Sequence, residues 1–217
     1  MKIIKSFRIK FEKTGLAKYI SHLDLNRLFS RSLARAGVET AHTEGYNPRP
    51  KIVFASAISL GIDSLCEFAD IKITTDETAA QIFEKIKNVF PQGINILEIY
   101  EPENDFKYID RTRFHIFIKP DGSFGTDELN GLNKLFEGGF YIEKKNGTSV
   151  NLKDYICGIT ISGETNEYKL IDAVLKTSQD MYMNPENIIK AVNSKYSVDD
   201  YFIKKTEVYD KNNRAFR

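Results

Sequence analysis

The stretch KIIKSFRIKFE, residues 2–12, alternates apolar and polar side chains. Phe7, Ile9 and Phe11 share one side of an extended chain, and charged residues occupy the other side. Because successive side chains of a strand point to opposite faces, this pattern predicts a strand with one buried face and one face in water. The fold therefore begins with a half-buried strand.

A well-marked helix start follows this strand. Ser21 can cap a helix, and Asp24 can complete a capping box in its first turn. Apolar residues then recur at steps of three and four as far as Ala36, and Gly37 suits the residue just after a helix end. The sequence thus predicts an amphipathic helix with one buried stripe.

Three further strands and a second helix complete the first hundred residues. Alternating or continuously apolar runs mark strands at 52–58, 66–74 and 94–100, and apolar residues at helical spacing mark a helix at 76–89. The order is β-α-β-β-α-β. This order is that of the split-βαβ, ferredoxin-like unit, a four-stranded antiparallel sheet with two helices on one face.

The second half of the chain repeats this pattern with one additional strand, after an acidic linker at residues 101–105. Strands are predicted at 111–119, 140–145, 152–162, 168–177 and 201–209, and helices at 126–136 and from Asn184 to Tyr196. We therefore expect an α+β fold of tandem ferredoxin-like (split β-α-β) units, with antiparallel sheets and helices on one face. The expected domains are residues 1–104 and 108–217.

The composition narrows the class of protein. With 41% apolar and 28% charged residues in 217, the chain is typical of a folded protein rather than a disordered one. It has no signal-peptide core and no run near the roughly 18 apolar residues of a membrane span, so we expect a cytoplasmic protein without a membrane partner. Cys66 and Cys157 lack metal-site spacing, so no metal and no cofactor are expected.

Charge is distributed unevenly along the chain. Residues 1–60 hold eleven Lys/Arg and four Asp/Glu, a net +7, whereas residues 61–107 hold four and ten, a net −6. The N-terminal block can therefore attract a polyanion.

Three arginines extend this basic character along the first predicted helix. Arg27, Arg31 and Arg35 lie four residues apart, so they share one sector of the helix surface. Guanidinium groups match phosphate oxygens, and no acidic ladder pairs with these three. A solvated helix face explains the same spacing, so both interpretations stay open.

His22 lies in the first turn of that helix. The helix dipole there favours an anion, so the neutral imidazole is preferred and can accept a proton or bind a substrate oxygen. A purely structural histidine is the alternative. A metal site would need His22, Asp24 and His42 together, and no HxxxH or Cys/His cluster supports one.

The loop EGYNPRPK, residues 44–51, is a candidate binding loop. Its two prolines favour an extended backbone that directs Arg49 and Lys51 outward, and Tyr46 can stack on a flat ring. Turn chemistry alone would explain Asn47 and Pro48 but not the two cations and the tyrosine.

The face of the first sheet away from its helices is a second candidate surface. Arg8, Lys10, Phe68 and Lys72 are expected to point onto it, and RNA-binding domains of this topology use such a face for base stacking. The RNP signature of those domains is absent from the chain.

Several of these motifs together resemble one bacterial family. The matching segments are ISHLD (20–24), LARAG (33–37), EGYNPRPK (44–51), Leu60-Gly61 and KTE (205–207). They resemble the radical SAM-linked protein family, a domain-of-unknown-function family whose members are fused to, or encoded beside, B12-binding-type radical SAM proteins. The resemblance implies a radical SAM protein as partner rather than a reaction of this chain, which lacks the CxxxCxxC cluster motif. Family members near ribonuclease G genes suggest an RNA setting.

Three hypotheses for function follow. The first is a non-catalytic RNA-binding companion that presents RNA to a radical SAM protein, with Tyr46 stacking on a base. Its phosphate-binding residues are expected to be Arg27, Arg31, Arg35, Arg49 and Lys51.

The second hypothesis is a metal-independent endoribonuclease that resembles the CRISPR-type repeat endoribonucleases. There His22 acts as the base, and Lys51 or Arg49 stabilises the charge on phosphorus. The third is a protein–protein adaptor that binds no nucleic acid.

Overall fold

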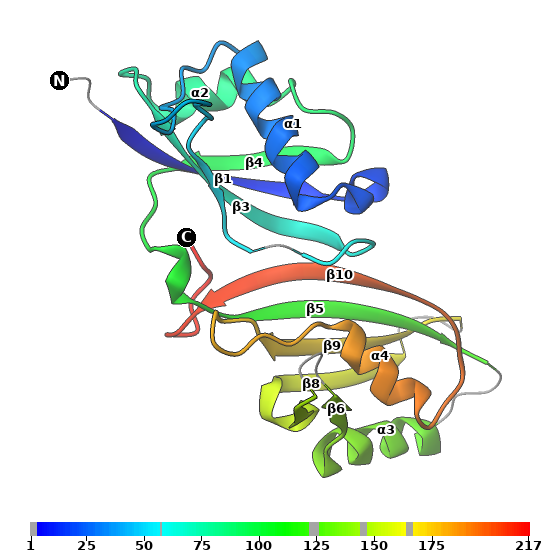
Figure 1. Cartoon of the computed structure of the whole chain (residues 1–217). Helices are drawn as coiled ribbons and strands as arrows, with labels where there is room; N and C mark the ends of the chain where they lie inside the picture. Colours follow the sequence, from blue (N-terminus) through cyan, green and yellow to red (C-terminus); the bar gives the residue numbers. More distant parts are fainter. Residues whose placement is uncertain (1–3, 57, 122–125, 144–146, 164–166) are drawn as a thin grey trace. The chain divides into compact units, whose positions relative to one another are not determined.

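The computed structural model describes residues 4–56, 58–121, 126–143, 147–163 and 167–217 (Figure 1). The chain divides into two compact units. Unit 1 is Met1–Phe106 together with Arg217, and unit 2 is Lys107–Phe216. The acidic linker expected at 101–105 lies at the end of unit 1.

Unit 1 has the element order of a ferredoxin-like fold. Its strands pair antiparallel in the order β4-β1-β3-β2, and the buried residues of both helices belong to one core with β1, β3 and β4 (Figure 1). The helices therefore cover one face of the sheet. The elements are β1 Lys5–Lys13, a 3-10 helix η1 Gly15–Tyr19, α1 His22–Arg35, β2 Ile52–Phe54, β3 Asp63–Ile73, α2 Ala79–Ile86 and β4 Ile94–Tyr100.

The alternation in β1 decides which face is covered. Phe7, Ile9 and Phe11 are buried in the core, where the ring of Phe11 lies 4.8 Å from that of Phe29 of α1. The ends of α1 are as predicted from their caps. Ser21 Oγ accepts a hydrogen bond from the backbone N–H of Asp24, and Gly37 adopts a φ of 69° after the last turn.

Unit 2 repeats the same topology. Its sheet has the order β10-β5-β9-β8, with antiparallel pairing throughout. The elements are β5 Ile109–Pro120, α3 Thr126–Gly138, β6 Tyr141–Glu143, β7 Ser149–Asn151, η3 Leu152–Tyr155, β8 Ile156–Gly163, β9 Lys169–Lys176, α4 Glu186–Asn193 and β10 Val198–Asp210. A short 3-10 turn, η2 Phe106–Tyr108, precedes β5. The predicted tandem of ferredoxin-like units is confirmed.

Some element predictions were wrong in detail. The strand expected at 52–58 is only Ile52–Phe54, and Ala57 lies outside the described residues. The additional strand predicted in the second half, at 140–145, corresponds to β6. It is not part of the main sheet but pairs with β7 in a separate two-stranded sheet. Leu152–Tyr155, expected as strand, is 3-10 helix. Within the described ranges, no helix has the length and apolar character needed to cross a membrane.

Tyr100, at the end of β4, makes unit 1 sensitive to alkaline pH. Burial raises the pKa of Tyr100 to about 12, and among the described residues its hydroxyl has no hydrogen-bond partner. An unfolded tyrosine ionises near pH 10, whereas folded Tyr100 keeps its proton to about pH 12. The free energy of unfolding should therefore fall as the pH rises through this window.

Tyr100→Phe should melt like the wild type at pH 8 and lose less stability above pH 10, since phenylalanine has no proton to lose. Burial similarly raises the pKa of Tyr209 to about 12, so part of the loss should persist. Circular-dichroism melting across the pH range checks this expectation. If the melting temperatures of the variant and the wild type fall equally with rising pH, Tyr100 does not contribute to the loss of stability at alkaline pH.

Candidate functional site

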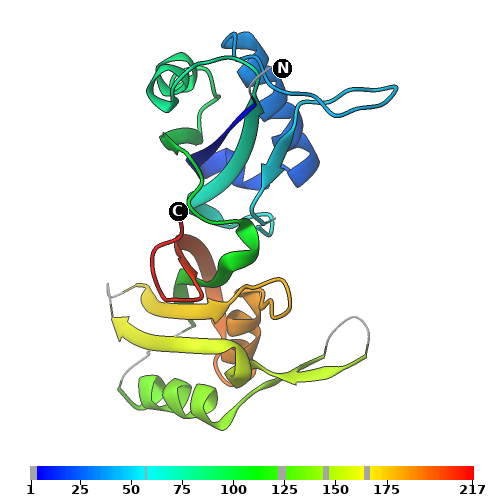
Figure 2. The ribbon, with the colours of Figure 1, turned by 90° about the vertical axis from the view of Figure 1, so that its left-hand side faces the viewer.

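The loop that follows α1 is a hairpin with a fixed base and an exposed tip. The backbone N–H of Thr43 donates to the carbonyl of Arg49 at 2.8 Å, and that of Lys51 donates to the carbonyl of Ala41 at 2.7 Å. We call residues 41–51 the basic hairpin. Figure 2 shows this hairpin, in light blue, extending beyond the helices and strands of unit 1. Its tip carries Tyr46, whose side chain is 99% exposed.

Arginines from α1 and from the basic hairpin meet at one groove of about 550 Å³. Arg27 and Arg31 line it from the helix, and Arg49 lines it from the hairpin. The remaining lining residues are Leu23, Asn26, Ser30 and Pro50. We call this cavity the helix–hairpin groove. Three of the arginines predicted to bind phosphate are thus brought together from two segments of the chain.

The charge in the helix–hairpin groove is only partly neutralised. Arg27 Nη1 lies 3.0 Å from Asp24 Oδ1 on the exposed surface. Hydrogen bonds from Ser21 and then from Arg27 hold the pKa of Asp24 below its usual value. Arg31 and Arg49 form no ion pair within the described parts of the chain. The groove therefore presents two guanidinium groups that remain available for an anion.

Arg35 does not belong to this groove. Its Nη2 donates to the carbonyl of Val89, just beyond α2, at 2.6 Å. The regular ladder predicted along the helix therefore divides into two parts. Arg27 and Arg31 face the hairpin, whereas Arg35 binds the backbone of a segment 54 residues away.

His22 is likewise separate from the arginines. It is exposed at the first residue of α1, and its ring meets the edge of Phe54 with centroids 5.4 Å apart. His22 lines neither the helix–hairpin groove nor the cavity that contains Lys51. In the part of the chain that the structure describes, no group of three or more His, Cys, Asp or Glu residues could hold a metal ion.

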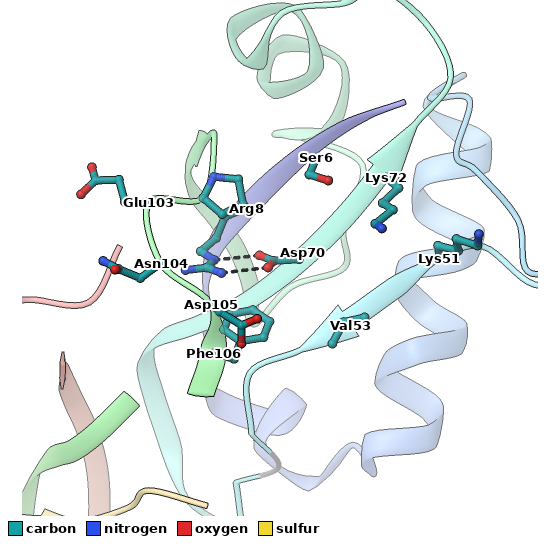
Figure 3. A pocket seen from close by; sticks show the side chains of 11 residues that line it. Ser6, Arg8, Lys51, Val53, Asp70, Lys72, Glu103, Asn104, Asp105 and Phe106 are labelled. Atoms are coloured by element: carbon teal, nitrogen blue, oxygen red, sulfur yellow. Dashed lines mark hydrogen bonds and ion pairs between the residues drawn. The ribbon is translucent and has the colours of Figure 1, made fainter. Parts of the chain in front are cut away.

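A second cavity of about 490 Å³ lies on the face of the unit 1 sheet that the helices leave free (Figure 3). We call it the sheet-face pocket. Ser6, Arg8, Asp70 and Lys72 line it from β1 and β3, and the linker closes one side. The other lining residues are Lys51, Val53 and the linker residues Pro102, Glu103, Asn104, Asp105 and Phe106.

Arg8 forms the floor of the sheet-face pocket. Its Nε and Nη2 donate to the two carboxylate oxygens of Asp70 at 2.7 and 2.8 Å, and its guanidinium carbon lies 4.2 Å from the ring centre of Phe106. Arg8 is 0% exposed and Phe68 only 2%. Arg8 thus points onto the predicted face, where it lines the pocket. The expectation that this face is open at Arg8 and Phe68 was wrong, because neither residue is exposed. Lys10, opposite Glu98 in the register, is half-buried.

Sequence reasoning missed the two features that build this pocket. The pairing of Asp70 with Arg8 was not predicted, because Arg8 lies 62 residues earlier. The composition of residues 101–105 predicts a linker and nothing more, although residues 102–106 line the cavity. The alternation of β3, with Asp70 and Lys72 on the polar side, was the available signal for the first feature.

The sequence of the chain matches one protein family. The model of the family described as "Uncharacterized protein conserved in bacteria (DUF2344)" matches residues 6–191. The chain belongs to this family. No curated protein matches it in sequence.

Comparison with solved structures supports the fold at low sequence identity. A chain of "Crystal Structure of a Cbf5-Nop10-Gar1 Complex" aligns with a TM-score of 0.52 and 9% identity over 93% of this chain. This chain spans about half of that protein, 48% of its length. The acetolactate synthase small subunit from Thermotoga maritima aligns with 12% identity, covering 96% of this chain and 98% of its own, but its TM-score of 0.29 is too low to bear on the fold.

In this family member, breaking the Arg8–Asp70 pair should be strongly destabilising. Asp70→Ala leaves a buried guanidinium without its carboxylate, and breaking a pair of this kind costs about 3–5 kcal/mol. Urea unfolding of the variant measures the loss.

Asp76→Ala is the matched control. Asp76 pairs with Lys5 at 2.6 Å, but its side chain is 90% exposed, so removing it should change stability little. Equal effects of the two substitutions would contradict the structural role of Arg8 and Asp70.

Proposed function

We propose that the protein is a non-catalytic RNA-binding companion of a B12-binding-type radical SAM protein, to which it presents RNA for modification. The observation that carries the proposal is the convergence of Arg27, Arg31 and Arg49 at the helix–hairpin groove. Lysines and arginines on phosphates supply most of the sequence-independent affinity for nucleic acid. Because two of these guanidinium groups have no acidic partner in the described chain, their charge is available for RNA phosphates.

The basic hairpin supports a single-stranded rather than a duplex ligand. Tyr46 stands at its tip with no covering side chain, so both faces of its ring can be reached. Unpaired bases stack on aromatic side chains, whereas the bases of a duplex are already stacked on one another. A backbone held by Arg31 and Arg49 can then direct a base toward Tyr46.

The chemistry in this proposal is assigned to a partner. The sequence has two cysteines, fewer than a CxxxCxxC cluster motif needs. The chain belongs to a bacterial family, in agreement with its resemblance to the bacterial radical SAM-linked proteins. The radical SAM partner itself is inferred from that resemblance. His22 lines neither the helix–hairpin groove nor the sheet-face pocket, so neither of these cavities supports the endoribonuclease hypothesis.

The first test of RNA binding is the salt dependence of affinity for a single-stranded RNA oligomer. Removing one arginine that binds a phosphate should reduce the slope of log K against log salt by about 0.7. Arg31→Gln with Arg49→Gln should therefore weaken binding at low salt and reduce the slope by about 1.4. Filter binding or fluorescence anisotropy measures both quantities.

Arg35→Gln is the control for this experiment. It removes one positive charge from the helix that carries Arg31 but lies outside the helix–hairpin groove, so the slope should stay near that of the wild type. An absence of RNA affinity at low salt, or an equal reduction of the salt slope for Arg35→Gln, would contradict the assignment of the helix–hairpin groove as the RNA-binding site.

A second test concerns base stacking at the hairpin tip. Tyr46→Ala should weaken RNA binding about tenfold, in line with the loss of one stacked base, and leave the salt slope unchanged. Tyr46→Phe keeps the ring and should bind like the wild type. Since Tyr46 is 99% exposed, neither change should lower the melting temperature. Unaltered affinity of Tyr46→Ala would exclude stacking at this position.

The partner is tested by purifying the tagged protein from its own cells. Mass spectrometry should identify a radical SAM protein, and sequencing should recover bound RNA. A radical SAM protein without RNA would contradict RNA binding and favour the adaptor hypothesis. RNA without a radical SAM protein would contradict the companion role.

A further inference from the structure

Two lysines stand side by side in the sheet-face pocket. The backbone N–H of Lys72 donates to the carbonyl of Lys51 at 3.3 Å, and the adjoining register pairs Ile52 with Ile71. The two lysines are therefore cross-strand neighbours, and both line the same cavity. Like charges directly opposite each other destabilise a sheet. Such an arrangement is relieved when an anion lies between the two ammonium groups.

The strands that line the pocket supply no anion to these lysines. Within the described residues, neither Lys51 nor Lys72 takes part in an ion pair. Among the described strand residues that line the pocket, Asp70 is the only carboxylate, and Arg8 occupies both of its oxygens at 2.7 and 2.8 Å.

The acidic side chains of the linker are directed elsewhere. A carboxylate oxygen of Glu103 lies 3.3 Å from Arg217 Nε. Figure 3 shows Asp105 beside Phe106, at the end of the pocket away from the two lysines. The positive charge at the lysine end is therefore left for a ligand.

The remaining walls of the pocket indicate what else the ligand carries. Ser6 lies opposite Lys72 in the register and adds an exposed hydroxyl on the Lys72 side of the pocket (Figure 3). Val53 is 58% exposed, and Figure 3 shows it between the lysines and Phe106. The cavity thus has a cationic end and an apolar part. Its volume of about 490 Å³ lies within the usual range for small-molecule sites, roughly 300–1,000 Å³.

We infer that the sheet-face pocket binds a nucleotide. Its phosphate lies between Lys51 and Lys72 within reach of the Ser6 hydroxyl, and its base lies along Val53 toward Phe106. The Arg8–Asp70 pair holds the floor in a fixed position and offers polar atoms to the edge of the base. The nucleotide can be a free small molecule or one unit of an RNA chain. This site does not depend on the helix–hairpin groove.

Isothermal titration calorimetry on the full chain tests this inference, with AMP, adenosine and a single-stranded RNA oligomer as probes. AMP should bind, and adenosine, which lacks the phosphate, should bind at least tenfold more weakly. Lys51→Gln with Lys72→Gln should weaken AMP binding at least tenfold. Arg31→Gln with Arg49→Gln should leave AMP binding unchanged.

The outcomes separate the two sources of the nucleotide. AMP binding that is abolished when both lysines are replaced supports a free nucleotide. RNA binding that depends on Lys51 and Lys72, without affinity for AMP, supports a nucleotide within RNA. The inference is overturned if replacing the two lysines weakens the binding of neither AMP nor RNA. It is also overturned if adenosine binds as tightly as AMP. The RNA contacts of the helix–hairpin groove can fail without affecting these results, because they are read from different variants.

Thermal melting gives an independent readout that does not require the correct base. Inorganic phosphate should raise the melting temperature of the wild type by mass action, and by more than it raises that of the Lys51→Gln, Lys72→Gln variant, which keeps only the general stabilising effect of the salt and any binding at the helix–hairpin groove. The variant should also melt no lower than the wild type without phosphate, since it removes a like-charge pair. Equal stabilisation of both proteins by phosphate contradicts an anion site at the lysines.

Discussion

The position of Arg8 opposite Asp70 fixes the register of the central strands of unit 1. A slip of one residue would turn Arg8 into the apolar core under the helices and Phe7 out of it. A charge without a partner in such a core is very costly, so the wrong register is strongly disfavoured. The correct register also places Ser6 opposite Lys72, and the pairing of β2 with β3 places Val53 opposite Asp70. One ion pair thereby orders most of the sheet-face pocket.

Unit 1 uses the two faces of one sheet for different purposes. Phe7, Ile9 and Phe11 of β1 belong to the core with α1 and α2, and Ser6 and Arg8 of the same strand line the sheet-face pocket. The helix–hairpin groove lies outside both layers, on the surface of α1. The basic hairpin connects the two regions, since Arg49 lines the groove and Lys51 lines the pocket. The two candidate sites are consequently close in sequence but chemically distinct.

Local sequence patterns predicted the fold better than they predicted the site. Alternation in β1 and the cap at Ser21 depend on neighbouring residues, so they were visible along the chain. The environments of Arg8 and Arg35 depend on Asp70 and Val89, which lie 62 and 54 residues away. No periodicity encodes such contacts. The candidate residues could therefore be named from the sequence. Their grouping could not be predicted, in particular the separation of Arg35 and His22 from the three arginines of the groove.

The closure of the basic hairpin at Thr43 and Arg49 has a consequence for how the family can vary. Among the described residues, no hydrogen bond or ion pair joins residues 44–48 to a strand, so the length of this segment can change without moving one. Each residue pair added to such an arm extends it by about 3.3 Å. Relatives can therefore alter how far the tip extends from unit 1 by insertion or deletion, while Arg49 at its base keeps its position.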